Sequence, residues 1–366
     1  MNEGRGPTPR PSAGKPVIAV NARFLLQPQG GVQRYAHELT MRILRTSSIS
    51  VRLLVPPNRV LRSAEEVSGS ERGRWGGAKG HLWEQLALPR LSREAGATLL
   101  LHLANTGLLR PHPQVVAIHD LAPFLFPESF RGVYAWWSRR LTRRISRNSK
   151  RIITVSERSR RHISEVLRIP PERISVIANG VGAPFNREPS SGAVRSDVCV
   201  FVGGHDPRKN LAFLLSMWEA VYSELGLRLA VVYRTGSGAH RGTVPVERSW
   251  LVSHTNLSDD ELVNLYATSL CVVSPSIYEG FGLPLLEAMA VGTPFLSSDT
   301  GAARELAVSP EQVVPLKADV WRERLRWLSR TDISLLERKS IERAKLYSWE
   351  ASAEQLVTLL LEEAGG

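Results

Sequence analysis

The sequence predicts an α/β protein with two doubly wound domains that face each other across a cleft. Short apolar runs rich in β-branched residues alternate with longer stretches of helical pattern, and this alternation predicts parallel sheets covered by helices on both faces. Residues 183–197, rich in Pro, Gly and Ser, have the composition of a linker, and the alternation restarts at Val198. Because ligands in such folds bind outside the carboxyl ends of the strands, the cleft is the expected site.

The expected strands fall into two groups, one on each side of the linker. Each is a short apolar run bounded by turn residues or by a helical stretch. The runs are 16–20, 51–55, 98–103, 114–120, 151–156 and 174–180 before the linker, and 198–204, 227–233, 249–254, 270–275 and 293–298 after it. A strongly apolar helix is expected over 352–363, and it must pack on the rest of the protein.

Composition narrows the class of protein. The 366 residues are 43% hydrophobic, which suffices for more than one core. No apolar run reaches about 18 residues, so no transmembrane helix is expected, and residues 1–14, polar and rich in Pro and Gly, are expected to be a disordered tail. Cys199 and Cys271 lie in apolar runs, which indicates buried reduced thiols and a cytosolic protein. No His/Cys cluster has zinc spacing.

The formal net charge of +12 is concentrated in one segment. Residues 131–151 contain eight basic side chains and no acidic one. Val133, Trp137, Leu141 and Ile145 recur every four residues, which predicts an amphipathic helix. Two interpretations stay open: a core-packed helix with a solvated basic face, or a surface that lies on anionic lipid. Nucleic acid fits the charge, but no recognition motif supports it, so no nucleic-acid partner is expected.

A double glycine follows the first strand after the linker. Gly203 and Gly204 precede Arg208 and Lys209, which open a helix. Backbone amides at a helix start, together with two cations, form an anion site. The alternative is a glycine turn followed by a solvated basic helix start.

The segment 276–294 carries a second turn of this kind between two glutamates. Glu279 precedes the turn, and Glu287 lies on the helix expected to begin near Pro284. Gly280 and Gly282 allow close approach of the backbone to a ligand. The amides that this turn leaves free belong to Phe281, Gly282 and Leu283. Since carboxylates accept hydrogen bonds from sugar hydroxyls, the two turns together suggest a sugar joined to a phosphate, although both glutamates could instead merely cap a helix.

Two motifs of the first domain lie at the carboxyl ends of its expected strands, where the cleft is expected. His119 and Asp120 directly follow an expected strand, at its carboxyl end. Gly30 and Gly31 form another strand-to-helix turn there. A lone histidine is more often structural than catalytic, and it is the position of His119 that favours a role in the cleft.

With these motifs the chain resembles glycosyltransferase family 4, whose members are retaining enzymes of the GT-B fold. The resemblance covers about Pro16 to Glu363. It also points to bacterial mannosyl- and rhamnosyltransferases of polysaccharide assembly. The matching segments are "GGVQRYAHEL", "WEQLALPRL", "IHDLAPFLFPESF", "RIITVSERSRRHI", "ISVIANGV", "VGGHDPRKNL", "NLSDDELVNLYATS", "PSIYEGFGLPLLEAMAVGTP" and "YSWEASAEQL".

The resemblance implies a division of labour between two Rossmann-like domains. The acceptor domain would comprise residues 15–182 plus 345–366, because the final helix crosses back onto it, and the donor domain residues 198–344. Glu279 is expected near the donor sugar hydroxyls and Glu287 on the nucleotide ribose. Arg208 and Lys209 are expected on the donor diphosphate. The amides of Gly280, Phe281, Gly282 and Leu283 would lie by the phosphates or the sugar.

In the acceptor domain, the family's His-Asp pair matches His119 and Asp120, and His119 would hydrogen-bond the donor sugar. Gly30 and Gly31 match the loop near the phosphates and the acceptor. Gly204 stands where some relatives place a further basic residue, which leaves Arg208 and Lys209 as the main phosphate cations. His119, Asp120 and Glu279 are accordingly the expected catalytic group, and the other named residues the donor-binding group.

The implied activity is transfer of a hexose, of mannose or rhamnose type, from a nucleotide-diphosphate sugar to a lipid-linked or polysaccharide acceptor. No cofactor or metal is expected, since the sequence has no Asp-x-Asp motif. The expected location is the cytoplasm, with peripheral contact of residues 131–151 at the inner face of the membrane. Two alternatives stay open: a catalytically silent GT-B partner or scaffold, and a sugar-nucleotide epimerase of the same architecture.

Overall fold

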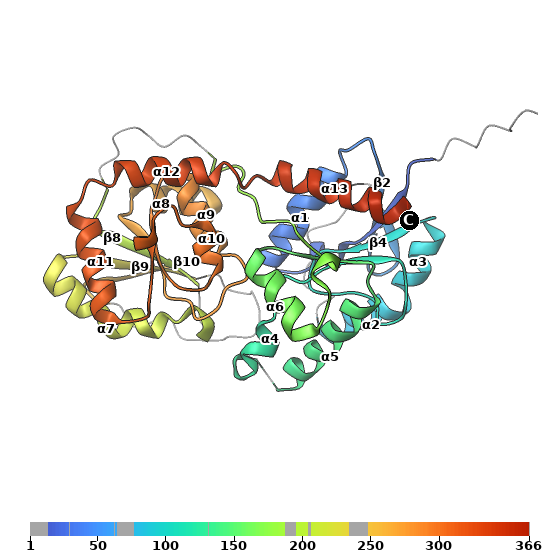
Figure 1. The fold of residues 1–366 in the computed structure, drawn as a ribbon, viewed down its shortest axis with the longest axis horizontal. Helices are drawn as coiled ribbons and strands as arrows, with labels where there is room; N and C mark the ends of the chain where they lie inside the picture. The colour runs from blue at the N-terminus through green and yellow to red at the C-terminus, as the bar shows by residue number, and fades with distance from the viewer. Residues whose placement is uncertain are drawn as a thin grey trace, which may run out of the picture.

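The computed structural model describes residues 14–28, 30–61, 63, 77–130, 132–186, 195–203, 206–233 and 248–365. Figure 1 shows two lobes side by side, each with a central sheet and helices around it. Residues 1–13 of the expected disordered tail, Gly204 and most of the expected linker (187–194) lie outside the described residues.

The first lobe is built on a seven-stranded sheet with the order β3-β2-β1-β4-β5-β6-β7. All its described pairings are parallel except that of β3 with β2. The strands are β1 (Val17–Asn21), β2 (Ser50–Val55), β3 (Arg59–Leu61), β4 (Leu99–His102), β5 (Gln114–Ala117), β6 (Arg151–Thr154) and β7 (Ile174–Val176). The helices are α1 (Gly31–Ile43), α2 (Gly77–Leu86), α3 (Leu88–Glu94), α4 (Ala122–Leu125), α5 (Gly132–Asn148) and α6 (Glu157–Leu167).

The second lobe has a six-stranded, fully parallel sheet with the order β10-β9-β8-β11-β12-β13. Its strands are β8 (Val198–Val202), β9 (Arg228–Tyr233), β10 (Leu251–Thr255), β11 (Cys271–Ser274), β12 (Phe295–Ser298) and β13 (Val313–Val314). Its helices are α7 (Leu211–Leu225), α8 (Asp259–Thr268), α9 (Leu283–Ala290), α10 (Ala302–Leu306), α11 (Ala318–Arg330) and α12 (Ser334–Ala344). The two-lobe α/β prediction is therefore confirmed.

The last helix, α13 (Trp349–Gly365), returns to the first lobe and lies along α1 (Figure 1). Trp349 is buried at the crossing, where a Cβ on Gly180 would come within 2.2 Å of its backbone nitrogen. Ser352 Oγ donates to the carbonyl of Ala178 at 2.9 Å, and Arg42 pairs with Glu350 at 2.7 Å. This crossing is the one that the resemblance implied.

The prediction that both cysteines are buried free thiols is also confirmed. Cys199 and Cys271 are free, fully buried and paired in register on the adjacent strands β8 and β11, with their sulfurs 3.6 Å apart. The contact with Cys271 and burial both raise the pKa of the Cys199 thiol, so this thiol stays protonated and unreactive.

The periodicity assigned to residues 131–151 is wrong at its first position. Leu141 and Ile145 are buried and Trp137 is half-buried, but Val133 is 83% exposed. The apolar face of α5 instead passes through Ala135. The start of α5 extends beyond the surface against which the rest of the helix packs. An apolar residue at the four-residue spacing is therefore exposed there.

Candidate functional site

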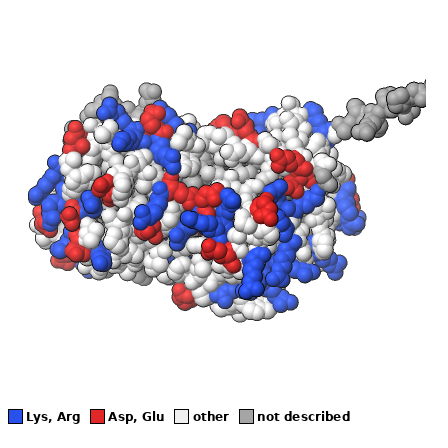
Figure 2. Space-filling view, in the orientation of Figure 1, with Lys and Arg blue, Asp and Glu red and all other residues white. Residues whose placement is uncertain are grey.

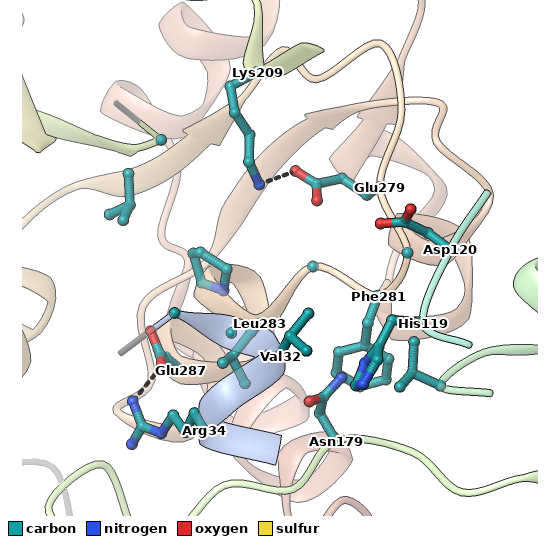
Figure 3. A pocket seen from close by; sticks show the side chains of 18 of the residues that line it. Val32, Arg34, His119, Asp120, Asn179, Lys209, Glu279, Phe281, Leu283 and Glu287 are labelled. Atoms are coloured by element: carbon teal, nitrogen blue, oxygen red, sulfur yellow. Dashed lines mark hydrogen bonds and ion pairs between the residues drawn. The ribbon is translucent and has the colours of Figure 1, made fainter. Parts of the chain in front are cut away.

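A cavity of about 300 Å³ lies between the lobes, at the carboxyl ends of the strands. Twelve of the fourteen predicted site residues line it. They are Gly30, Gly31, His119, Asp120, Gly203, Lys209, Glu279, Gly280, Phe281, Gly282, Leu283 and Glu287. They come from the start of α1 and the loop after β5 in the first lobe, and from the turns after β8 and β11 and the helix α9 in the second. Figure 3 shows the labelled His119, Lys209 and Glu279 among them.

Lys209 and Glu279 form an ion pair on the wall of the cavity (Figure 3). Asp206 caps the 3-10 turn that ends at Lys209, and this turn points the lysine across to the loop after β11. Lys209 Nζ donates to Glu279 Oε1 at 2.6 Å, and Ser276 Oγ donates to the same oxygen at 2.7 Å. Both bonds fall on one carboxylate oxygen, which leaves the other oriented for a ligand hydroxyl.

The glycine turn brings the loops of the two lobes into contact. A Cβ on Gly280 would lie 3.0 Å from the carbonyl oxygen of His119 and 3.3 Å from the Cβ of Asp120, so a larger residue here would push the two loops apart by a few tenths of an ångström. Gly282 has φ +97° and precedes the first turn of α9, in which Pro284 takes an early position. The amides at this helix start have no acceptor within the helix, and Phe281, Gly282 and Leu283, which carry them, line the cavity.

His119 is held as a neutral ring. Its Nε2 lies 2.9 Å from the carbonyl oxygen of Leu103, which can only accept, so Nε2 carries the proton and Nδ1 is the acceptor. The ring meets Tyr35 edge-on, with centroids 4.7 Å apart. Burial lowers the pKa of His119. The side chain can therefore accept a hydrogen bond from a sugar hydroxyl at neutral pH.

Asp120 stands beside His119 and has a local partner. Its Oδ1 accepts from the amide of Ala122 at 2.9 Å and so starts α4. Asp120 lines the cavity next to Gly280. The His-Asp pair thus has one member that accepts hydrogen bonds as a neutral ring and one that accepts them as a carboxylate.

Arg34 is the functional candidate that sequence reasoning did not single out. It projects from the first turn of α1 across the cleft, and its Nη1 lies 3.0 Å from Glu287 Oε1. The guanidinium also pairs with Asp259 at 3.4 Å and lies over the ring of Phe185, 5.1 Å from its centroid. The available signal was its place in "GGVQRY", three residues after Gly31 at a helix start facing the cleft.

Arg208 and Lys209, the two cations of the turn after β8, point in different directions. Arg208 Nη2 and Nε contact both carboxylate oxygens of Asp206, at 2.5 and 3.1 Å, and its guanidinium lies over the ring of Phe130. Arg208 is not on the cavity wall, whereas Lys209 is. Its expected contact with a diphosphate stays a prediction.

Comparison with known proteins agrees with this geometry. Residues 29–183 match the family described as Glycosyltransferase Family 4, and residues 196–328 match Glycosyl transferases group 1. The fold is that of the GT-B glycosyltransferases, and the two matches, to Glycosyltransferase Family 4 in the first lobe and to Glycosyl transferases group 1 in the second, place the chain among the glycosyltransferases.

Relatives in bacteria share most of the length of the chain. O-antigen chain mannosyltransferase B of Escherichia coli is 26% identical over 66% of this chain and 68% of its own. The MMP alpha-(1->4)-mannosyltransferase of Mycolicibacterium hassiacum is 29% identical over 72% of this chain and 67% of its own. The solved structure of Anabaena HepE in complex with UDP and glucose has a TM-score of 0.64 at 14% identity, covering 94% of this chain and 98% of its own.

Proposed function

We propose that the protein is a retaining glycosyltransferase that moves a hexose from a nucleotide-diphosphate sugar to a lipid-linked or polysaccharide acceptor. The observation that carries the proposal is the Lys209–Glu279 pair, which shares one cavity with the amides of the glycine turn and with the neutral His119. A mannose-type sugar is favoured, because both relatives above are named as mannosyltransferases.

The reaction follows from the charges that appear in it. Breaking the bond between the sugar and the diphosphate leaves negative charge on the diphosphate, which Lys209 and the amides after Gly280 stabilise. The acceptor attacks from the face that the nucleotide leaves, and its hydroxyl proton passes to the departing phosphate. Glu279 Oε2 and His119 Nδ1 accept hydrogen bonds from sugar hydroxyls and hold the ring during the step. No protein nucleophile takes part, and the charge is neutralised without a metal ion.

Donor selection tests this proposal. The purified protein would be incubated with UDP-glucose, UDP-galactose, GDP-mannose and dTDP-rhamnose, with and without EDTA, while release of the nucleoside diphosphate is followed. We expect slow release from one donor at an unchanged rate in EDTA. Retention predicts an α-linked product from an α-linked donor, which the anomeric proton signals would show. Absence of release from every donor would favour the silent-partner alternative, and isomerisation of the free donor would favour the epimerase.

We further propose that the enzyme works in the cytoplasm with α5 against the anionic face of a membrane. The first turn of α5 exposes three large side chains, Val133 (83%), Tyr134 (52%) and Trp136 (61%). Basic side chains gather over the same helix on the face shown in Figure 2. Aromatic and aliphatic tips next to cations are the composition of a helix that lies in the headgroup region. In the described part of the chain, no helix has the length and apolarity needed to cross a bilayer.

Vesicle sedimentation tests the membrane proposal. Vesicles containing about one third anionic lipid should bind the wild type, and neutral vesicles should not. Trp136→Ser and the pair Arg140→Glu with Arg147→Glu should each reduce binding severalfold. Trp327→Ser is the matched control, because Trp327 is also partly exposed (36%) but lies on α11 of the other lobe. Equal binding of all four proteins would contradict the proposal.

A further inference from the structure

The start of α6, in the first lobe, contacts the glycine turn after β11, in the second lobe, through two serine hydroxyls. Ser156 Oγ lies 2.7 Å from the carbonyl oxygen of Gly280, and Ser159 Oγ lies 3.2 Å from the same oxygen. Ser159 Oγ is also 3.0 Å from the carbonyl oxygen of His119, so its single proton is shared between the two loops that carry Glu279 and His119. Ser156 is at once the N-cap of α6, accepting from the amide of Ser159 at 3.1 Å.

The consequence of these contacts lies on the other side of the peptide bond. The carbonyl of Gly280 and the amide of Phe281 belong to one planar trans unit, in which C=O and N–H point in opposite directions. Two hydroxyls that fix the carbonyl from the first lobe therefore fix the direction of the Phe281 N–H. Gly280, Phe281 and Gly282 all line the cavity, so the orientation of this peptide decides whether the amide meets the ligand.

A second contact joins α6 to the same lobe. Glu305 of α10 accepts from the amide of Arg158 at 2.9 Å through Oε1, and from the amide of Glu157 at 3.1 Å through Oε2. Arg343 and Tyr347 in turn donate to the backbone carbonyl of Glu305, at 2.7 and 3.2 Å. The first turn of α6 is thus held by the second lobe at two places, and the lobes cannot separate there without breaking the bonds of Ser156 and Ser159 to Gly280 and those of Glu305 to the α6 amides.

From this geometry we infer that Ser156 and Ser159 are positioning residues. They orient the Gly280–Phe281 peptide from the first lobe, so that the Phe281 N–H is in place for the nucleotide sugar only when the lobes are closed. This rests on the proposed function for its kinetic consequence. The two lobes then contribute differently to the site. The second lobe supplies groups that touch the nucleotide sugar, and α6 of the first lobe aligns them. Neither serine touches substrate.

Substitutions can separate this role from helix capping. Ser159→Ala removes one hydroxyl at a helix position that tolerates alanine well. Ser156→Asp keeps an N-cap acceptor but removes the donated proton, and Ser156→Thr keeps both. Ser164→Ala, on the same helix and away from these contacts, is the matched control. Each variant would be compared with the wild type by thermal unfolding, by donor turnover, and by small-angle scattering with and without 1 mM UDP or GDP.

The expected result is a loss in kcat without a matching loss in KM. Ser159→Ala should lower kcat about tenfold and the double variant Ser156→Asp/Ser159→Ala about a hundredfold, with KM changed less than about twofold. Ser156→Thr and Ser164→Ala should keep wild-type kcat. The double variant should also have a larger radius of gyration than the wild type, a result that needs no activity and so decides the role of the serines even if the proposed function fails. Unchanged kcat and radius of gyration in the double variant, or losses of kcat that follow a fall in Tm, would overturn the inference.

Discussion

Each lobe has a cluster of charged and polar side chains near the carboxyl ends of its strands, and the two clusters are built differently. In the first lobe, Glu84 is fully buried and accepts four hydrogen bonds, two on each oxygen. Its donors are Asn21, Arg23, His81 and Thr106. In the second lobe, the bonds that Glu279 accepts from the described residues Lys209 and Ser276 fall on one oxygen, and its carboxylate lines the cavity.

The difference distinguishes a cluster whose carboxylate is fully hydrogen-bonded within the protein from the cluster that we propose binds the donor. Burial alone would raise the pKa of Glu84, but the hydrogen bond from His81 and the charge of Arg23 lower it to about 2. A carboxylate whose acceptor positions are all occupied has nothing to offer a ligand. Among the described residues, the partners of Glu279 contact its Oε1, so a sugar hydroxyl can donate to Oε2. Substitutions in the first cluster should therefore affect stability, and those in the second should affect catalysis.

Lys209→Met should give the largest effect. It removes the cation that faces the developing charge while keeping a side chain of similar length. We expect kcat/KM for the active donor to fall by about a thousandfold, comparable to the loss of a donor that stabilises a transition-state anion. Steady-state release of the nucleoside diphosphate measures it, and an unchanged Tm would show that the fold is intact. A loss of less than threefold would remove Lys209 from the site.

Glu84→Gln should act on stability. The new side-chain NH2 group would face hydrogen-bond donors that now bond to the carboxylate, and the buried Arg23 would lie beside a neutral group. We therefore expect a loss of about 3 kcal/mol in the free energy of unfolding. Urea denaturation measures it. Glu94→Gln, which breaks an exposed pair with Arg90, is the control and should leave the unfolding midpoint unchanged. A Glu84→Gln protein that is as stable as the wild type would show that the cluster is not structural.

The buried His102, whose Nδ1 lies 3.2 Å from Nδ2 of Asn21 in the same cluster, should make the stability of the protein depend on pH. Burial lowers its pKa from 6.5 to about 4, so the folded protein binds fewer protons than the unfolded chain between these values. The contribution of His102 to the free energy of unfolding is therefore complete above pH 6.5 and declines as the pH falls towards 4. The loss between pH 7.5 and pH 5 is about 2 kcal/mol. Urea unfolding at both pH values measures this loss. In His102→Gln the loss should be smaller by about that amount, and an identical loss would rule out His102 as its source.

Arg34→Gln should have the smallest of these effects. Arg34 orients Glu287 from the other lobe, so its loss should weaken nucleotide binding with little effect on the chemical step. We expect KM to rise about fivefold at constant kcat, a change typical of losing one charge-assisted contact. Asp259→Asn is a graded comparison, because Asp259 is the more distant carboxylate on the same guanidinium. A fall in kcat at constant KM would instead place Arg34 in the reaction itself.

The sequence predicts the parts of this comparison that depend on local pattern. Continuous apolar runs indicated the buried parallel strands, and the glycine turns after β8 and β11 indicated the cavity. The short edge strands β3 and β13 were missed because two or three residues carry no period. The Arg34–Glu287 and Ser156–Gly280 contacts join residues 253 and 124 positions apart, so they follow from how the lobes meet. No local pattern encodes that arrangement.

The central claim, that the cavity between the lobes holds the nucleotide of a sugar donor, is tested most directly by calorimetric titration of UDP and GDP. We predict that one of them binds the wild type, and that Glu287→Gln and Lys209→Met each weaken this binding about tenfold or more, while Glu94→Gln leaves it unchanged. Binding that is equally tight in all four proteins would place the nucleotide elsewhere and contradict the account.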